Sequence, residues 1–249
     1  MSDDRISNDR RTFLKFSATA GAALGLGAVR GGPSELAAHS PAPAKSPPVR
    51  GRAMRILVLG GTSFIGPHQI QYALDRGHSV TLFNRGRTNT ELFPEVEKLV
   101  GDRAAEGGLD ALKGKTWDVV VDNSATNPKW VHDTAQLLKD QAERYIFVST
   151  RSTYADVSRI PMSIEAPVWT YESAGVEPGA ERLPYGLSKA LAEAEARDAF
   201  GERATVFRPG LIIGPRDTTD RFTYWPVRID RGGEILAPGS GSDPVQIID

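Results

Sequence analysis

The sequence contains no cysteine and only four histidines among its 249 residues. Without cysteine the chain forms no disulfide, offers no thiolate nucleophile and binds no metal through sulfur. The four histidines are scattered, and their spacing is not that of metal ligands: His39, His68, His78 and His132. Disulfide-stabilised folds, cysteine-dependent catalysis and zinc-finger modules are therefore excluded.

The chain also lacks an excess of charge, because 30 basic residues offset 31 acidic ones and leave a net charge of −1. A balanced charge gives no basic field, so a nucleic-acid partner is not indicated. Hydrophobic residues at 40% and charged residues at 24% are ordinary for a soluble globular protein. The length allows one large domain, or one and a half domains of common size.

No apolar run near the N-terminus is comfortably long enough to span a bilayer. The weakly apolar stretch 16–29 is shorter than the roughly 20 residues that a spanning helix needs. It follows Asp9-Arg-Arg-Thr-Phe-Leu-Lys15, which resembles a twin-arginine (Tat) export signal, and Ala42-Pro-Ala44 offers a cleavage site. We therefore expect a Tat signal peptide at 1–44 and a linker at 45–53. The Tat machinery would export the chain to the periplasm or out of the cell, without a stable membrane span. A disordered tail that carries two arginines is the alternative.

From Met54 onward, apolar runs alternate with stretches of helical spacing. Strands this apolar are typical of a parallel sheet that helices cover on both faces. The alternation predicts a doubly wound α/β (Rossmann) domain at 54–214, followed at 215–249 by the start of a smaller substrate-binding region. We expect strands at 55–59, 79–84, 97–101, 117–122, 144–149, 204–207 and 211–214, and helices at 65–76, 128–142 and 185–200.

A glycine-rich turn joins the first strand to the first helix. In such a turn, backbone N–H groups and the helix dipole can bind a pyrophosphate. Gly60 permits the tight turn, and Gly66 lets the helix pack closely on the sheet. The strict G-x-G-x-x-G pattern is not met, but the turn resembles the G-x-x-G-x-x-G loop of extended short-chain dehydrogenases/reductases, with Ser63 in place of the central glycine. Serine is small and its hydroxyl could donate to the phosphate, so we expect binding by Gly60, Gly61, Thr62, Ser63, Phe64, Ile65 and Gly66.

Arginines follow the second strand, where an acidic residue normally binds the ribose hydroxyls of the cofactor. The segment here is Asn84-Arg-Gly-Arg87. Arg85 and Arg87 cannot accept a hydrogen bond from a 2′-hydroxyl, but they pair well with a 2′-phosphate. This pattern favours NADP over NAD and leaves both open, since the arginines could equally be solvated loop charges. Gly101-Asp102 resembles the family's Gly-Asp pair, whose carboxylate contacts the adenine amine.

Tyr185-Gly-Leu-Ser-Lys189 opens the helix after the fifth strand, where this superfamily carries its catalytic pair. One helical turn places Tyr185 and Lys189 on the same face. A free phenol has a pKa of about 10, and a nearby ammonium stabilises the phenolate and lowers that pKa. We therefore expect Tyr185 to act as acid and base, with Lys189 assisting it. A Tyr and a Lys on an exposed helical face is the alternative.

The segment after the fifth strand supplies the expected third catalytic residue. Thr150 lies four residues before Tyr154 and so matches the family's S-x-x-x-Y-G segment, although Ala155 replaces its glycine. The resemblance implies that Thr150, rather than Ser149, hydrogen-bonds the substrate group that Tyr185 protonates or deprotonates. In the same family the stretch that matches Arg208-Pro-Gly210 lies against the nicotinamide, which makes Pro209 a cofactor contact.

Together these motifs resemble the NAD-dependent epimerase/dehydratase family of extended short-chain dehydrogenases/reductases, over about residues 54–249. The resemblance implies an enzyme that transiently oxidises or reduces a carbon of a sugar or nucleotide-sugar with NAD or NADP. The chain ends at Asp249 in a stretch that resembles a strand of these relatives, so we expect an incomplete substrate-binding half.

Two other interpretations stay open. Plant chloroplast stem-loop RNA-binding proteins share the Gly-Gly-Thr-x-Phe-Ile-Gly loop, so the chain could be a non-catalytic protein that binds a cofactor or RNA. The abrupt end would also suit a degenerate fragment without function. The sequence leaves open the sugar, the net reaction and the oligomeric state, monomer or homodimer.

Overall fold

This computed structural model describes residues 51–248, except 124, 160, 238 and 242–244. The predicted signal peptide and most of the predicted linker lie outside the described residues.

The described part divides into two compact units, residues 51–218 with 245–248 and residues 219–241. In the smaller unit, Arg228 of α6 (Tyr224–Asp230) donates to the carbonyl of Gly232 over 2.6 Å. That residues 215–249 form a substrate-binding region stays a prediction.

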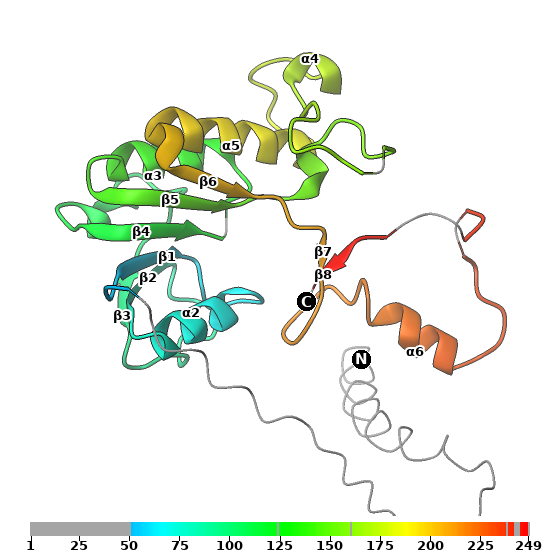
Figure 1. Ribbon diagram of the computed structural model, residues 1–249, viewed down its shortest axis with the longest axis horizontal. Coiled ribbons are helices and arrows are strands. Elements are labelled where there is room, and N and C mark those ends of the chain that lie inside the picture. Colours follow the sequence, from blue (N-terminus) through cyan, green and yellow to red (C-terminus); the bar gives the residue numbers. More distant parts are fainter. Residues whose placement is uncertain (1–50, 124, 160, 238, 242–244, 249) are drawn as a thin grey trace, which may run out of the picture. The chain divides into compact units, whose positions relative to one another are not determined.

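A six-stranded parallel sheet forms the centre of the larger unit (Figure 1). Its strand order is β3-β2-β1-β4-β5-β6, which confirms the predicted doubly wound α/β fold class. The chain crosses from β3 to β4 on the far side of β1, so the strand order reverses between β1 and β4; ligands bind at such a point in this class of fold. The strands are β1 (Arg55–Leu59), β2 (Ser79–Asn84), β3 (Glu97–Val100), β4 (Trp117–Asp122), β5 (Ala142–Val148) and β6 (Ala204–Phe207).

Helices cover both faces of this sheet. Successive side chains of a strand point to opposite faces, and β1 shows the result. Leu57 and Leu59 belong to a core cluster shared with α3 (Pro128–Leu138) and α5 (Tyr185–Phe200), whereas Ile56 and Val58 pack with Ile70 of α2 (Gly66–Asp75). Figure 1 shows α3 and α5 side by side, with α2 away from both.

The predicted helix at 128–142 is wrong beyond Leu138, where α3 ends. Ala142 is instead the first residue of β5 and pairs with Trp117 of β4. The Trp117 N–H also donates to the Gln141 carbonyl over 2.9 Å, which fixes the start of that pairing. The long proline-containing connection after β5 holds two short helices, η2 (Arg151–Thr153) and α4 (Tyr171–Ala174).

The remaining short elements complete the larger unit. Two-residue strands β7 (Leu211–Ile212) and β8 (Ile247–Ile248) pair in parallel, so the predicted strand at 211–214 is shorter than expected. The 3-10 turns η1 (Asp110–Leu112) and η3 (Gly201–Arg203) precede β4 and β6. Among the helices that the structure describes, not one combines the length and the apolar character needed to cross a bilayer.

Candidate functional site

A cavity of about 470 Å³ lies where β1, β2 and the start of α2 meet. All seven predicted loop residues line it, together with Asn84, Arg85, Arg87 and Asp102. The residues predicted for the nicotinamide end and for catalysis are not part of its wall: Thr150, Tyr185, Lys189 and Pro209. The wall further contains Phe83, Thr88, Gly101, Arg103, Asn123, Trp130 and Ile212, of which the sequence pointed only to Gly101.

The glycine loop depends on its first two glycines and its last. Gly60 and Gly61 have φ angles of 92° and 89°, a region that side chains rarely adopt. A Cβ on Gly66 would lie 2.4 Å from the Cα and carbonyl oxygen of Gly61, so the helix could not approach the loop this closely with any other residue. Ser63, by contrast, has an exposed side chain. Its carbonyl accepts from the Gly66 N–H over 3.0 Å, so serine at the central position is compatible with this turn.

Asn84 occupies the place of the usual acidic residue, and its side chain hydrogen-bonds to backbone groups. Its Nδ2 donates to the Gly60 carbonyl over 3.2 Å, and its Oδ1 accepts from the Gly86 N–H over 2.8 Å. Arg85 and Arg87 are exposed where they line the cavity. The end of β2 therefore presents two cations and no carboxylate to the cavity, which suits an anionic ligand.

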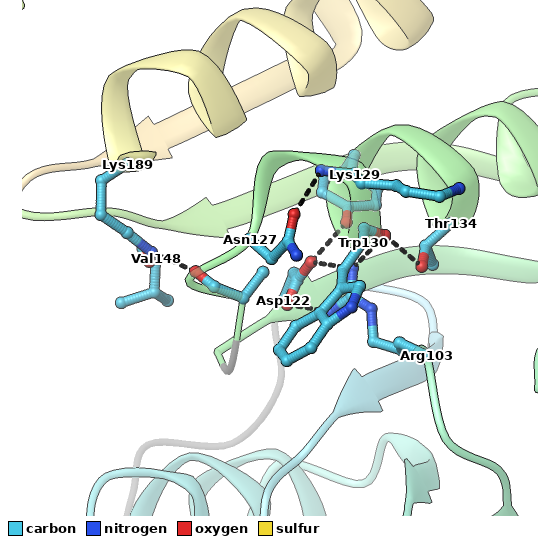
Figure 2. A network of polar contacts seen from close by, with 10 residues as sticks. Arg103, Asp122, Asn127, Lys129, Trp130, Thr134, Val148 and Lys189 are labelled. Carbon is cyan, nitrogen blue, oxygen red and sulfur yellow. Dashed lines mark hydrogen bonds and ion pairs between the residues drawn. The ribbon is translucent and has the colours of Figure 1, made fainter. Parts of the chain in front are cut away.

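Arg103 of the cavity wall forms a buried ion pair that sequence patterns did not indicate. The Arg103 guanidinium donates to both carboxylate oxygens of Asp122, over 2.9 and 2.8 Å, and to the Trp130 carbonyl over 2.7 Å (Figure 2). The Tyr145 hydroxyl donates to Asp122 over 2.6 Å. Burial favours the neutral acid, but Arg103 and Tyr145 outweigh it and lower the pKa of Asp122. Through its bond to the Trp130 carbonyl, Arg103 fixes the backbone of Trp130, which also lines the cavity.

Lys189 is buried, with 3% of its surface exposed. Its Nζ donates to the carbonyls of Ala125 and Val148 over 2.9 and 2.8 Å, and lies 4.1 Å from the ring centre of Phe147. Figure 2 shows the side chain directed at the Val148 carbonyl. These contacts tie α5 to the ends of β4 and β5. Burial lowers the pKa of Lys189 to about 8, against the opposing effect of Asp122 and Glu193.

This lowered pKa predicts a pH-dependent stability. Below about pH 8 both the folded and the unfolded chain carry a charged Lys189, and the folded state bears the full cost of burying it. Between pH 8 and the ordinary value of 10.5 only the unfolded chain keeps the proton, so the free energy of unfolding rises, by up to about 3 kcal/mol from this residue.

Urea unfolding from pH 7 to pH 10 measures this rise, with a Lys189→Met variant as the reference for all other titrating groups. The wild type is expected to gain stability with pH relative to Lys189→Met. Parallel curves for the two proteins would contradict a buried ammonium at this position.

Thr150 and Ser149 differ in what their hydroxyls contact. Thr150 is partly exposed and caps η2, with its Oγ1 accepting from the Ser152 N–H over 3.2 Å. Ser149 is buried and donates to the Glu193 carboxylate over 2.5 Å. The Thr150 hydroxyl is thus the more accessible of the two, although the assignment of a catalytic hydroxyl stays a prediction.

The start of α5 packs directly on the turn that follows Thr150. Tyr185 is its first residue and 55% of its surface is exposed. A Cβ on Gly186 would lie 2.2 Å from the Ser152 carbonyl oxygen, so glycine is required for this approach. The Ser188 hydroxyl donates to the Thr126 carbonyl and so anchors the first turn of α5 to the connection between β4 and α3. Tyr185 therefore begins a helix that is fixed against both neighbouring connections, and it stays accessible.

Comparison with protein-family models gives two matches. Residues 56–248 match the family model described as NAD dependent epimerase/dehydratase family, and residues 7–27 match the Tat (twin-arginine translocation) pathway signal sequence. The second match confirms the predicted export signal.

Within the described residues, no group of three or more His, Asp or Glu side chains is arranged to hold a metal ion.

Curated relatives match over most of this chain and about half of their own length. The sterol-4-alpha-carboxylate 3-dehydrogenase, decarboxylating, of Mus musculus is 28% identical over 186 residues, which are 67% of this chain and 48% of that protein. The chloroplast stem-loop binding protein of 41 kDa b of Arabidopsis thaliana is 25% identical over 201 residues, which are 75% of this chain and 50% of that protein.

Solved structures support the fold. A UDP-galactose 4-epimerase is 21% identical with a TM-score of 0.57, and the match covers 74% of this chain and 65% of that one. The Bordetella bronchiseptica enzyme WbmG in complex with NAD is 20% identical with a TM-score of 0.58, covering 75% and 63%. The Rossmann-type architecture is common to all three chains.

Proposed function

Because the chain belongs to the NAD dependent epimerase/dehydratase family, we propose that it is an enzyme that uses NAD or NADP to epimerise, dehydrate or reduce a sugar or nucleotide-sugar. The observation that carries the proposal is the buried Lys189, bonded to two carbonyls one helical turn after the exposed Tyr185. Similarity to UDP-glucose 4-epimerases, at 25% and 26% identity, supports the substrate class.

The residues at the cavity fit a dinucleotide. The close contact of Gly66 with Gly61 leaves backbone rather than side chain at the turn, as a bound pyrophosphate requires. Gly60–Gly66 would hold the pyrophosphate, and Asp102 with Asn84 would lie at the adenosine end. Pro209 would lie toward the nicotinamide. The bound cofactor supplies the hydride acceptor or donor, which the side chains of this chain cannot provide.

In the proposed mechanism Tyr185 transfers a proton to or from the substrate oxygen while the adjacent carbon changes its oxidation state. Lys189 in its charged form stabilises the phenolate, and its two carbonyl bonds hold it in place. Thr150 donates to or accepts from the same substrate oxygen and so orients it. The buried position of Lys189 keeps water from screening its charge.

The cofactor preference gives the first test. We expect tighter binding of NADP than of NAD, because Arg85 and Arg87 can pair with the 2′-phosphate. Calorimetric titration of the full chain measures both dissociation constants. An Arg85→Ala/Arg87→Ala double variant should lose about tenfold or more in NADP affinity and leave NAD affinity within about twofold.

Arg144→Ala serves as the matched control, because Arg144 is an exposed arginine on β5 and does not line the cavity. Equal losses for NAD and NADP in the double variant would refute the 2′-phosphate assignment. Failure of the wild type to bind either dinucleotide would refute the proposed function as a whole.

The similarity to the Arabidopsis stem-loop binding protein favours a second candidate function, a non-catalytic cofactor-binding or RNA-binding protein. Filter binding of RNA at two salt concentrations separates the candidates, because binding through phosphates weakens steeply as salt rises. RNA retention that falls with salt, together with an absence of dinucleotide binding, would favour this second function.

The Tat signal indicates export by the Tat pathway. We propose that the folded protein acts in the periplasm or outside the cell. The complete absence of cysteine is compatible with an oxidising compartment.

A further inference from the structure

Two asparagines connect the glycine loop to the last residue of β2 and to the segment that follows it. The Asn89 Nδ2 donates to the Thr62 carbonyl over 2.7 Å, and the Asn84 Nδ2 donates to the Gly60 carbonyl over 3.2 Å. Asn89 itself has a φ angle of 45°. Asparagine tolerates this left-handed conformation better than most residues other than glycine. The residue type at 89 therefore satisfies two requirements, the backbone angle and the side-chain donor.

The bond from Asn89 fixes the orientation of one peptide group in the loop. A trans peptide group is planar, and its C=O and N–H point in opposite directions. With its Thr62 carbonyl bonded to Asn89, this peptide directs the Ser63 N–H away from Asn89. Ser63 lines the cavity, and an N–H on the side away from Asn89 would be available to an anion bound there.

The position of this peptide matters because Ser63 stands where the loop pattern has a glycine. A peptide followed by serine has fewer accessible conformations than one followed by glycine, but it still rotates unless a bond holds it. A carbonyl that turned toward the cavity would repel a phosphate. Holding the Thr62 carbonyl on the Asn89 side removes that alternative before any ligand binds.

We propose that Asn89 is a positioning residue for pyrophosphate binding, which holds the Thr62–Ser63 peptide so that its N–H is available to the phosphate. The inference rests on the proposed function, since it assumes that a dinucleotide occupies the cavity. The same bond holds the segment of Arg85 and Arg87 against the glycine loop. Together with the bond from Asn84 to Gly60, it joins the two parts of the proposed cofactor site.

Two variants test the proposal by calorimetric titration of the full chain with NAD and with NADP. Asn89→Gly keeps the positive φ angle and removes the donor. Asn89→Asp keeps the shape but replaces the amide donor by a carboxylate. Each is expected to raise the dissociation constants for both dinucleotides about fivefold to tenfold, and the aspartate at least as much as the glycine.

Thr90→Gly is the control, because it adds the same backbone freedom at the neighbouring exposed residue and keeps the Asn89 side chain. Its dissociation constants should stay within about twofold of the wild type. Melting temperatures of all four proteins report on the fold separately, and we expect them to agree within a few degrees.

The outcomes are distinguishable. A wild type that binds neither dinucleotide refutes the proposed function. A wild type that binds, with Asn89→Gly or Asn89→Asp binding equally well, refutes the role of Asn89 and leaves the function standing. A loss in Thr90→Gly as large as in Asn89→Gly also refutes that role, because loop flexibility alone would then account for it.

Discussion

The Tyr185→Phe variant is expected to bind NAD and NADP as the wild type does and to turn over substrate about 10²–10⁴ times more slowly. The substitution removes one hydroxyl from a half-exposed side chain, so neither packing nor the glycine loop is disturbed. In the proposed mechanism the variant loses the proton transfer to the substrate oxygen, whereas Lys189 keeps its bonds to the Ala125 and Val148 carbonyls.

Single-turnover absorbance of the reduced nicotinamide measures this loss once a panel of UDP-sugars has identified a substrate. Tyr72→Phe is a matched control, because Tyr72 on α2 is also 55% exposed and does not line the cofactor cavity. Its turnover should equal that of the wild type. Full turnover in Tyr185→Phe would remove the phenol from the mechanism, whatever the cofactor titrations show.

The elements that the sequence predicted well are those whose pattern is local and strong. The run from Trp117 to Asp122 is centred on three consecutive valines, and it forms β4 with the predicted bounds because a strand buried on both faces needs such apolar residues. The helix after Asn127 was predicted too long, since apolar spacing continues past Leu138 to Ala142. Pairing of Ala142 with Trp117 decides that boundary, and it depends on residues far apart in the sequence.

The features of the candidate site also differ in whether local sequence could predict them. The glycine loop could be predicted because a phosphate-binding turn consists of consecutive residues, and all of them line one cavity. The bond from Asn89 to Thr62 and the pair of Arg103 with Asp122 join residues 27 and 19 positions apart. No periodicity in the sequence reports such contacts, because only the strand order of the folded sheet brings them together.

The choice between Ser149 and Thr150 shows why side-chain partners matter. The sequence offers two neighbouring hydroxyls at the end of the fifth strand and, apart from a family pattern, no means of choosing between them. The structure gives Ser149 a buried carboxylate as its partner, on a helix 44 positions away. That leaves Thr150 the more accessible hydroxyl, and a Thr150→Val variant is the direct way to examine its role.

The Glu193→Ala variant is expected to lower the free energy of unfolding by about 3–5 kcal/mol, the cost of breaking a buried ion pair by removing one partner. Glu193 is 1% exposed and accepts from the Ser149 hydroxyl over 2.5 Å. It also accepts from Arg208, from Nε over 2.9 Å and from Nη2 over 2.5 Å. Arg208 in turn stacks on the Tyr154 ring at 4.6 Å. Alanine at 193 would remove the carboxylate partner of a partly buried cation and the acceptor of a buried hydroxyl.

Urea unfolding at pH 7 measures the loss, with Glu195→Ala as the matched control on the same helix. Glu195 pairs with His132 at the surface over 2.7 Å, and such exposed pairs contribute less than about 1 kcal/mol. Glu193→Gln should fall between the two, since it keeps an acceptor for Ser149 but not the charge that Arg208 needs. Equal losses for Glu193→Ala and Glu195→Ala would contradict a buried ion pair.

Because Ser149 precedes Thr150 and Arg208 precedes Pro209, the same carboxylate holds together the strand ends that the proposed mechanism uses. A structural loss at Glu193 should therefore also weaken dinucleotide binding, whereas Glu195→Ala should leave it unchanged.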